Sequence, residues 1–262
     1  MALALSACAG MNRDSARESD PKMSSGSLTG DVLVARVASG DRDTDVAAAR
    51  YGYALAADPD NLQLLERAFI FSLSAGEMDE AGRFAELLIA RKDEAPLAHV
   101  TLGILALKRG NPAEAVTQLE QAGGRGSSFT GAMLGSWALA AAGRSDDALA
   151  ALEHAPDRMP NARFIQYHAA LIASLAGKAA EAEQAYKDAL GADQRRNPRL
   201  VRAYAAFLDG QGRHDEALAL LKETEGGAGE DPGVAAARRE ALSGSRITPV
   251  VATAREGMAE VL

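Results

Sequence analysis

The chain has 262 residues, of which 47% are hydrophobic and only 5% aromatic, so the core must be built mainly from aliphatic side chains, which favours close-packed helices. Its 36 Asp and Glu residues outnumber 28 Lys and Arg, and the net charge of −8 argues against a nucleic-acid partner, because phosphates repel an acidic surface. The single cysteine excludes an internal disulfide, a cysteine-based zinc site and an iron–sulfur centre within this chain.

The first residues predict a site of lipid attachment. Leu5-Ser6-Ala7-Cys8 resembles the lipobox of bacterial lipoproteins, in which a signal peptidase cuts before the cysteine and lipid is attached to its sulfur. The stretch before Cys8 is short and carries no Lys or Arg, so residues 1–8 are interpreted as a clipped signal peptide with a lipobox. The alternative is an ordinary Ala- and Leu-rich start with an unmodified thiol.

Residues 9–27 are polar, rich in serine and without hydrophobic periodicity. This composition is typical of a flexible linker, and about 20 such residues reach roughly 25 Å on average. We therefore expect a tether between a membrane and the folded part of the chain.

A repeating motif begins after this tether. Alanines recur at intervals of 33 to 35 residues, at Ala47, Ala81, Ala115, Ala148, Ala182 and Ala217. Each of the last five follows an acidic residue directly and a glycine by five positions, the glycines being Gly76, Gly110, Gly143, Gly177 and Gly212. So regular a spacing identifies a repeat protein before any helix is assigned.

Each position of the motif predicts a structural role. Hydrophobic residues at helical spacing precede every glycine, which suits the left-handed residue that ends a helix. The acidic residues then open a second helix, where they face its N-terminal dipole, and the small alanine lets the two helices cross closely. Such a helix pair cannot bury its apolar face alone, so neighbouring pairs must stack into one continuous core.

The period resembles the tetratricopeptide repeat, whose unit is a pair of antiparallel helices. Repeats would begin near Leu28, Leu62, Pro96, Phe129, Arg163 and Pro198. The family's position for a small residue in the first helix falls on Ala35, Phe69, Gly103, Ser136, Ala170 and Ala205, and the residue is small in all of these except Phe69. The resemblance implies an all-α fold, an α-solenoid of about six stacked helix–turn–helix repeats over residues 28–229 that forms a right-handed superhelix. It implies no particular function, because such repeats serve many unrelated partners.

Residues 230–262 predict additional helices. Glu230-Asp-Pro-Gly-Val234 indicates a turn into a helix that ends at Leu242, and Thr248-Pro249 begins a second helical pattern through Val261-Leu262. This last pattern has no Gly, Lys or Arg to end it, so we interpret it as the start of a truncated continuation of the repeats. The alternative is a final helix that folds back as a cap, with Met258 and Val261 inward.

No residue pattern predicts catalysis. The four histidines, His99, His154, His168 and His214, include no pair at the spacing of a helical metal site. The glycine-rich stretch from Gly123 to Ser128 lacks the Lys-Ser/Thr of a phosphate loop and is better explained as an enlarged linker. The acidic pairs recur at helix starts, which indicates caps. We expect no enzymatic activity, no metal or other cofactor and no small-molecule substrate.

The candidate site is a surface instead. The resemblance implies that set positions of each first helix line a concave face, and in the third to fifth repeats these positions are almost all apolar, with polar residues such as Gln63, Arg199, Arg202 and Asp209 in the flanking repeats. An apolar groove with a polar rim is typical of a protein-binding site. Its predicted residues are Leu97, Val100, Ile104, Leu107, Met133, Trp137, Phe164, Tyr167 and Leu171. Two alternatives stay open: these side chains pack against neighbouring helices, or a segment such as residues 247–262 covers them.

The sequence thus favours a non-enzymatic scaffold that binds a protein or peptide partner. It would be lipid-anchored through Cys8 in the bacterial cell envelope, facing the periplasm, and act in the assembly of an envelope or secretion machine. Ala9 after the cysteine favours the outer membrane over the inner. The alternative is a soluble cytoplasmic solenoid that spaces or oligomerises the domains of a longer protein.

Overall fold

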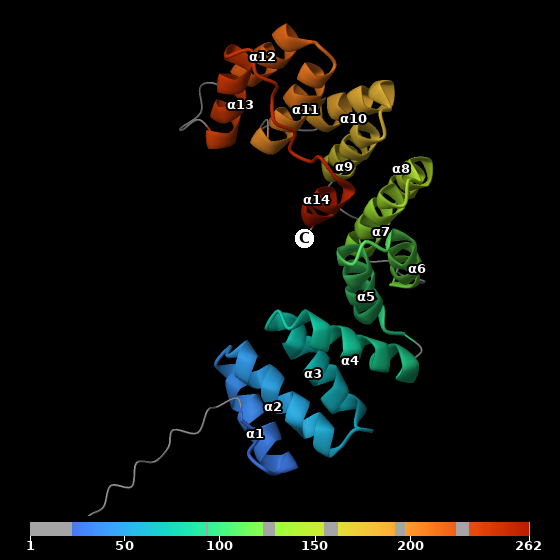
Figure 1. Cartoon of the computed structure of the whole chain (residues 1–262), viewed down its shortest axis with the longest axis vertical. Coiled ribbons are helices and arrows are strands. Elements are labelled where there is room, and N and C mark those ends of the chain that lie inside the picture. The colour runs from blue at the N-terminus through green and yellow to red at the C-terminus, as the bar shows by residue number, and fades with distance from the viewer. Residues whose placement is uncertain are drawn as a thin grey trace, which may run out of the picture. The chain divides into compact units, whose positions relative to one another are not determined.

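The computed structural model describes residues 23–92, 94–122, 129–154, 162–191, 197–223 and 231–261, which form helices and their connections and include no strand (Figure 1). Cys8, most of the predicted tether and the linker from Gly123 to Ser128 lie outside these residues. The helices are α1 (Leu28–Gly40), α2 (Thr44–Ala57), α3 (Leu62–Ser74), α4 (Met78–Arg91), α5 (Pro96–Lys108), α6 (Pro112–Ala122), α7 (Phe129–Ala141), α8 (Ser145–Glu153), α9 (Ala162–Leu175), α10 (Ala179–Gly191), α11 (Pro198–Gly210), α12 (His214–Lys222), α13 (Pro232–Leu242) and α14 (Ala254–Ala259). None of these helices is long and apolar enough to cross a membrane.

The chain divides into two units, Met1–Arg91 and Lys92–Leu262. The first unit contains α1 to α4 and the second contains α5 to α14. In both units the helices pack as consecutive pairs, and the six pairs from α1–α2 to α11–α12 coincide with the six predicted repeats. The predicted all-α architecture of stacked helix pairs is confirmed.

The turn that joins the two helices of a pair explains why glycines recur at a regular spacing along the chain. Gly76, Gly110, Gly143, Gly177 and Gly212 all have φ between 72° and 78°, the left-handed region that glycine enters without strain. The first repeat has Arg42 at the equivalent place, with φ 61°, and it is the one described residue other than glycine with a positive φ. The predicted role of the five glycines is confirmed.

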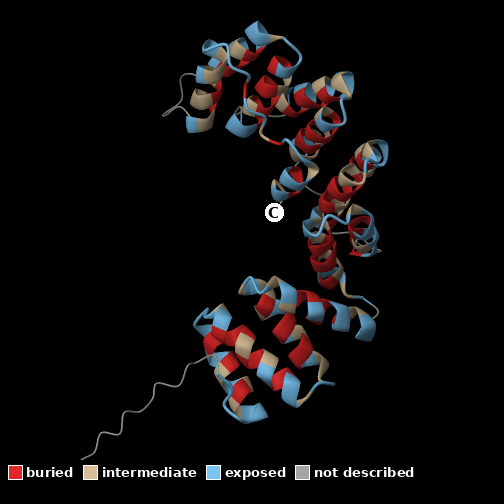
Figure 2. Cartoon of the chain, in the orientation of Figure 1, coloured by how far each residue is buried: buried red, intermediate tan, exposed pale blue. Residues whose placement is uncertain are grey.

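The recurring alanines lie on the buried faces of the second helices. All six, from Ala47 to Ala217, are fully buried, and the helices turn their buried faces toward one another within each unit (Figure 2). In each of the six pairs, the second helix carries an acidic residue in its first turn, as the motif predicts. The sequence repeat therefore records the packing of one helix pair, used six times.

A buried carboxylate fixes the start of the first unit. Asp31 of α1 forms an ion pair with Arg50 of α2 at 2.8 Å and accepts hydrogen bonds from the Ser24 hydroxyl and the Ser25 backbone. Burial alone would raise the pKa of Asp31, but these hydrogen bonds together hold it below its usual value. The last residues of the predicted tether are thus bound to α1, and Ser27 caps this helix.

The residues after the sixth pair follow the prediction in part. Helix α13 ends at Leu242 as expected, and Gly244 follows with a φ of 71°. The helix predicted from Thr248 was wrong at its start, because residues 248–253 are not helical and α14 begins only at Ala254. Thr253 has extended backbone angles and its side chain accepts from the Glu256 amide, so it caps α14 at this point.

Candidate partner-binding groove

The nine predicted groove residues lie on the first helices of three consecutive pairs, α5, α7 and α9, all in the second unit. Each helix contributes residues three or four positions apart, which a helix places on one face. The predicted residues on one helix are called a row below. The row on α5 is accessible to solvent, whereas the rows on α7 and α9 are covered.

The row on α5 is open. Leu97 is 47% exposed. Val100, Ile104 and Leu107 are half-buried and pack against the edge of the core. These four residues form an accessible apolar surface, as the groove hypothesis requires.

The rows on α7 and α9 are covered. Met133 and Trp137 of α7 are completely buried, and Tyr167 and Leu171 of α9 are nearly so, whereas Phe164 is half-buried. Helix α14 packs on both α7 and α9 and supplies the cover (Figure 1). For these two rows the structure shows the alternative of an intramolecular cover, with Met258 inward. Whether a partner also binds here stays a prediction.

An aromatic cluster lies beneath α14. The indole N–H of Trp137 donates to Nδ1 of His168 at 2.9 Å, so this nitrogen is unprotonated and the neutral ring carries its proton on Nε2. The His168 ring also contacts Phe164 and Tyr167 edge-on, with ring centroids 4.3 and 5.3 Å apart. Burial lowers the pKa of His168 to about 4, and Nε2 has no hydrogen-bond partner among the described residues. The histidine therefore serves as a neutral acceptor that orients the tryptophan.

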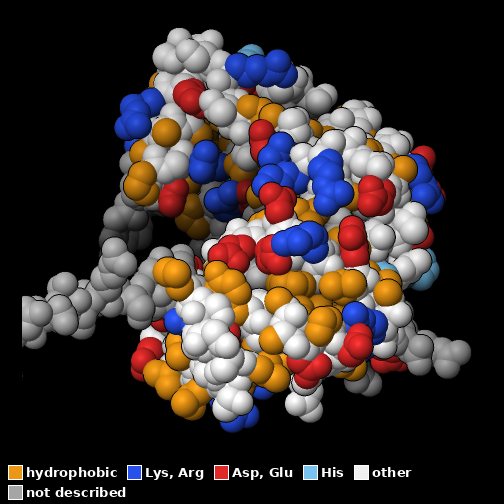
Figure 3. Space-filling view, turned by 60° about the horizontal axis from the view of Figure 1, so that its bottom comes forward, with side chains coloured by type: hydrophobic (Ala, Val, Ile, Leu, Met, Phe, Trp, Pro, Cys, Tyr) orange, Lys and Arg blue, Asp and Glu red, His pale blue; other side chains and the backbone are white. Residues whose placement is uncertain are grey.

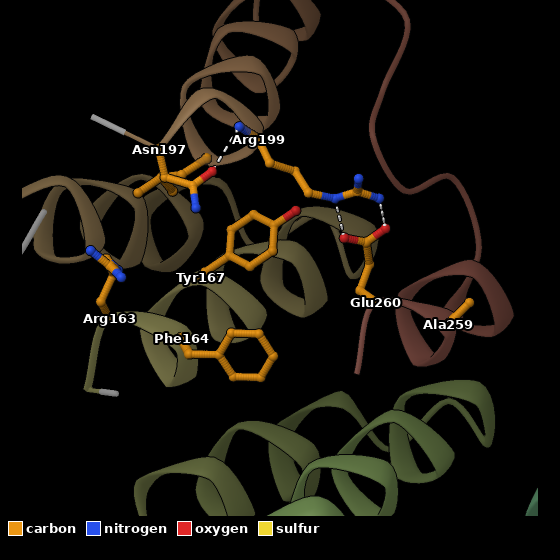
Figure 4. Close-up of a pocket in the computed structure, with 8 residues that line it drawn as sticks. Arg163, Phe164, Tyr167, Asn197, Arg199, Ala259 and Glu260 are labelled. Carbon is orange, nitrogen blue, oxygen red and sulfur yellow. Dashed lines mark hydrogen bonds and ion pairs between the residues drawn. The ribbon is translucent and has the colours of Figure 1, made fainter. Parts of the chain in front are cut away.

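An ion pair closes the same region from the side (Figure 4). The guanidinium of Arg199, on α11, donates two hydrogen bonds to the carboxylate of Glu260, just after α14. The ring of Tyr167 points toward this pair, and burial together with the charge of Glu260 raises the pKa of the Tyr167 hydroxyl, which stays protonated at neutral pH. A pocket of about 440 Å³ lies here, with Arg163, Phe164 and Asn197 on its far side.

A second polar residue of α11 holds the chain that leads to α14. The carboxylate of Asp209 is buried and accepts a hydrogen bond from the backbone N–H of Ile247 at 2.8 Å, and it also contacts His214. Ile247 itself is almost completely buried. Beyond this point, residues 249–252 line a pocket of about 510 Å³ together with Leu171 and Phe207. The chain thus crosses α11 and α9 before it reaches α7.

Sequence reasoning found part of this arrangement. The sequence predicts Arg199 and Asp209 as polar residues that flank the groove, and in the structure both bind C-terminal residues, Arg199 through Glu260 and the buried Asp209 through the backbone of Ile247. Whether they border a partner-binding groove stays a prediction. Sequence reasoning missed Glu260 and the role of His168, since neither residue belongs to a repeated position that marks a contact. On the face shown in Figure 3, basic and acidic side chains are interspersed, with hydrophobic side chains between them.

Comparison with known proteins supports the fold. No family model and no curated protein matches the sequence. Among solved structures, the tetratricopeptide-repeat protein YrrB superposes with a TM-score of 0.54 at 18% identity, over 64% of this chain and 87% of its own. The pilus biogenesis factor PilW gives 0.54 at 18% identity over 75% and 92%. A repeat protein from Parabacteroides merdae gives 0.54 at 15% over 82% and 84%. The chain has the fold of tetratricopeptide-repeat proteins.

Proposed function

We propose that this chain is a protein-binding scaffold that holds a peptide segment of a partner protein along the concave residues of α5, α7 and α9. The observation that carries the proposal is that two of these three rows already hold a peptide segment, the chain's own residues around α14. A surface that accommodates backbone, apolar side chains and a carboxylate from outside the repeats has the properties of a peptide-binding site. The open row on α5 extends this surface.

The similar structures favour the same use of the fold. YrrB is described as having an unusual peptide-binding site, and PilW as a biogenesis factor of type IV pili. We extend to this chain the general role of binding a protein segment. Combined with the lipobox-like residues, it supports an envelope scaffold anchored by lipid on Cys8 and facing the periplasm, with the outer membrane favoured over the inner.

The groove is tested by site-specific crosslinking in cells. A photoreactive amino acid replaces Leu97, which is exposed on α5, and as a control it replaces Glu120, which is exposed on the second helix of the same pair. We expect a discrete crosslinked partner at Leu97 and none at Glu120. Equal crosslinking at the two positions, or none at either, would contradict the groove.

The structure also shows which substitutions are unsuitable for this purpose. Trp137 and Tyr167 are buried beneath α14, so their replacement by alanine would damage the fold as well as any binding surface. A second groove variant is therefore Leu97→Glu, which changes only an exposed side chain. In an affinity pull-down, this variant should no longer retain the partner identified by crosslinking at position 97, while its helical circular dichroism should be unchanged.

The membrane anchor is tested separately. Cells that express the protein from its natural coding region are labelled with palmitate, and Cys8→Ser is the control. We expect label on the wild-type chain, recovery of that chain in the membrane fraction, and loss of both in Cys8→Ser. Label that persists in Cys8→Ser would contradict lipid attachment at this residue.

A further inference from the structure

The residues that follow α13 contact the first helices of three consecutive pairs, α11, α9 and α7. Below, residues 246–261 are called the C-terminal segment. Ile247 is held by Asp209 of α11, residues 249–252 lie beside Leu171 of α9, and α14 packs on α7 and α9. Most of the segment before α14 is not helical. A non-helical stretch that ends in a short helix therefore lies against these first helices, as a separate peptide ligand would.

Helix α14 meets α7 through its backbone. Gly257 lies on the indole ring of Trp137 so closely that a Cβ atom at this position would collide with the ring. The neighbouring Met258 is 5% exposed and joins the hydrophobic core around Trp137 and Tyr167. Any segment bound in this place must accordingly present a residue without a side chain to Trp137, followed by an apolar residue.

The carboxylate of Glu260 adds a charged contact to these apolar ones. Its side chain is only 10% exposed and is bound in two places by Arg199. A planar guanidinium matches a carboxylate in this manner, which makes the contact selective for an acidic side chain. Counted along the chain from Gly257, the three contacts fall at the first, second and fourth residues, the last of which directly follows α14.

Two observations make α14 exchangeable. It has six residues, and a helix of that length does not persist in water without its packing partners. In addition, its attachment point at Ile247 lies on α11, so residues 254–261 can leave α7 and α9 while the segment stays anchored. Leu97 on α5, which lies outside this cover, is exposed and offers an incoming segment a first apolar contact.

We propose that the C-terminal segment is a built-in occupant of the groove, and that a partner segment of the same chemistry displaces its residues 254–261. That partner segment is an apolar stretch that ends in a short helix with glycine against Trp137, an apolar residue next to it and a carboxylate for Arg199. The proposal rests on the proposed function. It adds that the free chain is closed at α7 and α9 and that the partner's sequence is constrained at three positions.

The first test opens the groove within the full chain. Gly257→Leu places a large side chain against Trp137 and should expel α14, whereas Ala259→Leu, at an exposed position of the same helix, is the matched control. Trp137 is the only tryptophan, so its fluorescence reports the cover directly. We expect a red-shifted emission in Gly257→Leu and wild-type emission in Ala259→Leu. Wild-type emission in both variants would overturn the proposal.

The second test uses a fluorescein-labelled peptide of residues 246–262. It should bind Gly257→Leu at least tenfold more tightly than the wild-type chain, whose groove is occupied. A peptide carrying Glu260→Arg should lose this binding and regain it on a Gly257→Leu chain that also carries Arg199→Glu. Equal affinity for wild type and Gly257→Leu, or no effect of the charge reversal, would overturn the proposal.

A milder variant covers the case in which Gly257→Leu disturbs the fold. Glu260→Gln removes only the charged contact and should increase peptide binding severalfold relative to wild type, and unchanged binding would count against the proposal. Crosslinking at position 97 distinguishes the built-in occupant from the proposed scaffold function. A partner captured equally by wild type and Gly257→Leu refutes the built-in occupant and leaves the scaffold function intact. Peptide binding without any partner at Leu97 refutes the partner groove and leaves the intramolecular occupant intact.

Discussion

The groove rows on α5 and on α7 have the same apolar character in sequence and opposite fates in structure. Leu97 on α5 is 47% exposed, while Trp137 on α7 is fully buried. What separates them is α14, which packs on α7 and α9. A residue's position in the repeat therefore does not by itself decide whether its side chain is accessible to a partner, because a segment outside the repeats can cover it.

The largest expected effect comes from removing the central side chain of the covered row. Trp137→Ala should destabilise the second unit by about 3–5 kcal/mol, because it leaves a cavity and deprives His168 of its donor. Leu97→Ala, on the open row, should change stability by less than about 0.5 kcal/mol. Denaturation followed by circular dichroism measures both variants, and similar losses in the two would contradict the contrast between the rows.

Acid should weaken the covered row selectively. Burial lowers the pKa of His168 to about 4 from its ordinary value of 6.5. The unfolded chain therefore takes up a proton at higher pH than the folded chain, and stability falls as the pH drops from 6.5 toward 4. At about 1.4 kcal/mol per pKa unit the loss reaches about 3 kcal/mol.

The measurement compares wild type with His168→Gln, which does not titrate. The stability difference between the two should shrink steadily over this pH range. A difference that stays constant with pH would show that His168 does not contribute.

Helix α5, which carries the open row, should be stabilised mainly by its packing against α6, the second helix of its pair. A Cβ atom at Gly103 of α5 would lie 2.6 Å from Cγ of Leu119 on α6, so Gly103→Ala should overpack this contact. Overpacking costs about 1–3 kcal/mol, which exceeds the gain of up to about 1 kcal/mol in helix propensity. Gly135→Ala on α7 has open space at the same atom and should be neutral or stabilising. Thermal melts of the two variants decide the point, and the reverse order would refute it.

The smallest effect concerns the ion pair at the edge of the cover. Because Arg199 is more than half exposed, its pairing with Glu260 should stabilise the chain by no more than about 1 kcal/mol. A double-mutant cycle with Arg199→Gln and Glu260→Gln measures the coupling, which should decline at high salt. A coupling that is zero at low salt would place the stability of α14 entirely in its apolar contacts.

Much of the fold was readable from local signals. The glycine at the turn and the buried alanine of the second helix are required by the packing within one helix pair. Because the pair is repeated, the same residue types recur at a fixed spacing and can be recognised in the sequence. Arg42 shows the limit of this reasoning, because it adopts the same left-handed turn without the residue type that would reveal it.

The candidate site depended on contacts that no repeat encodes. Gly257 fits against Trp137 although 120 residues separate them, and nothing near Gly257 in the sequence indicates an aromatic ring as its neighbour. The hydrophobic pattern of residues 248–262 suits a continued helix as well as a folded-back one. Only the tertiary packing of Met258 and the pairing of Glu260 distinguish the two.

The buried carboxylate of Asp31 has a mechanical consequence. The chain that precedes α1 is joined to it by hydrogen bonds from Ser24 and Ser25, and Arg50 of α2 clamps the same carboxylate. Tension that arrives through the preceding residues is therefore shared between two helices before it can unwind the first turn of α1. A scaffold pulled from that end would yield first at this clamp, and protonation of Asp31 in strong acid would lower the force required.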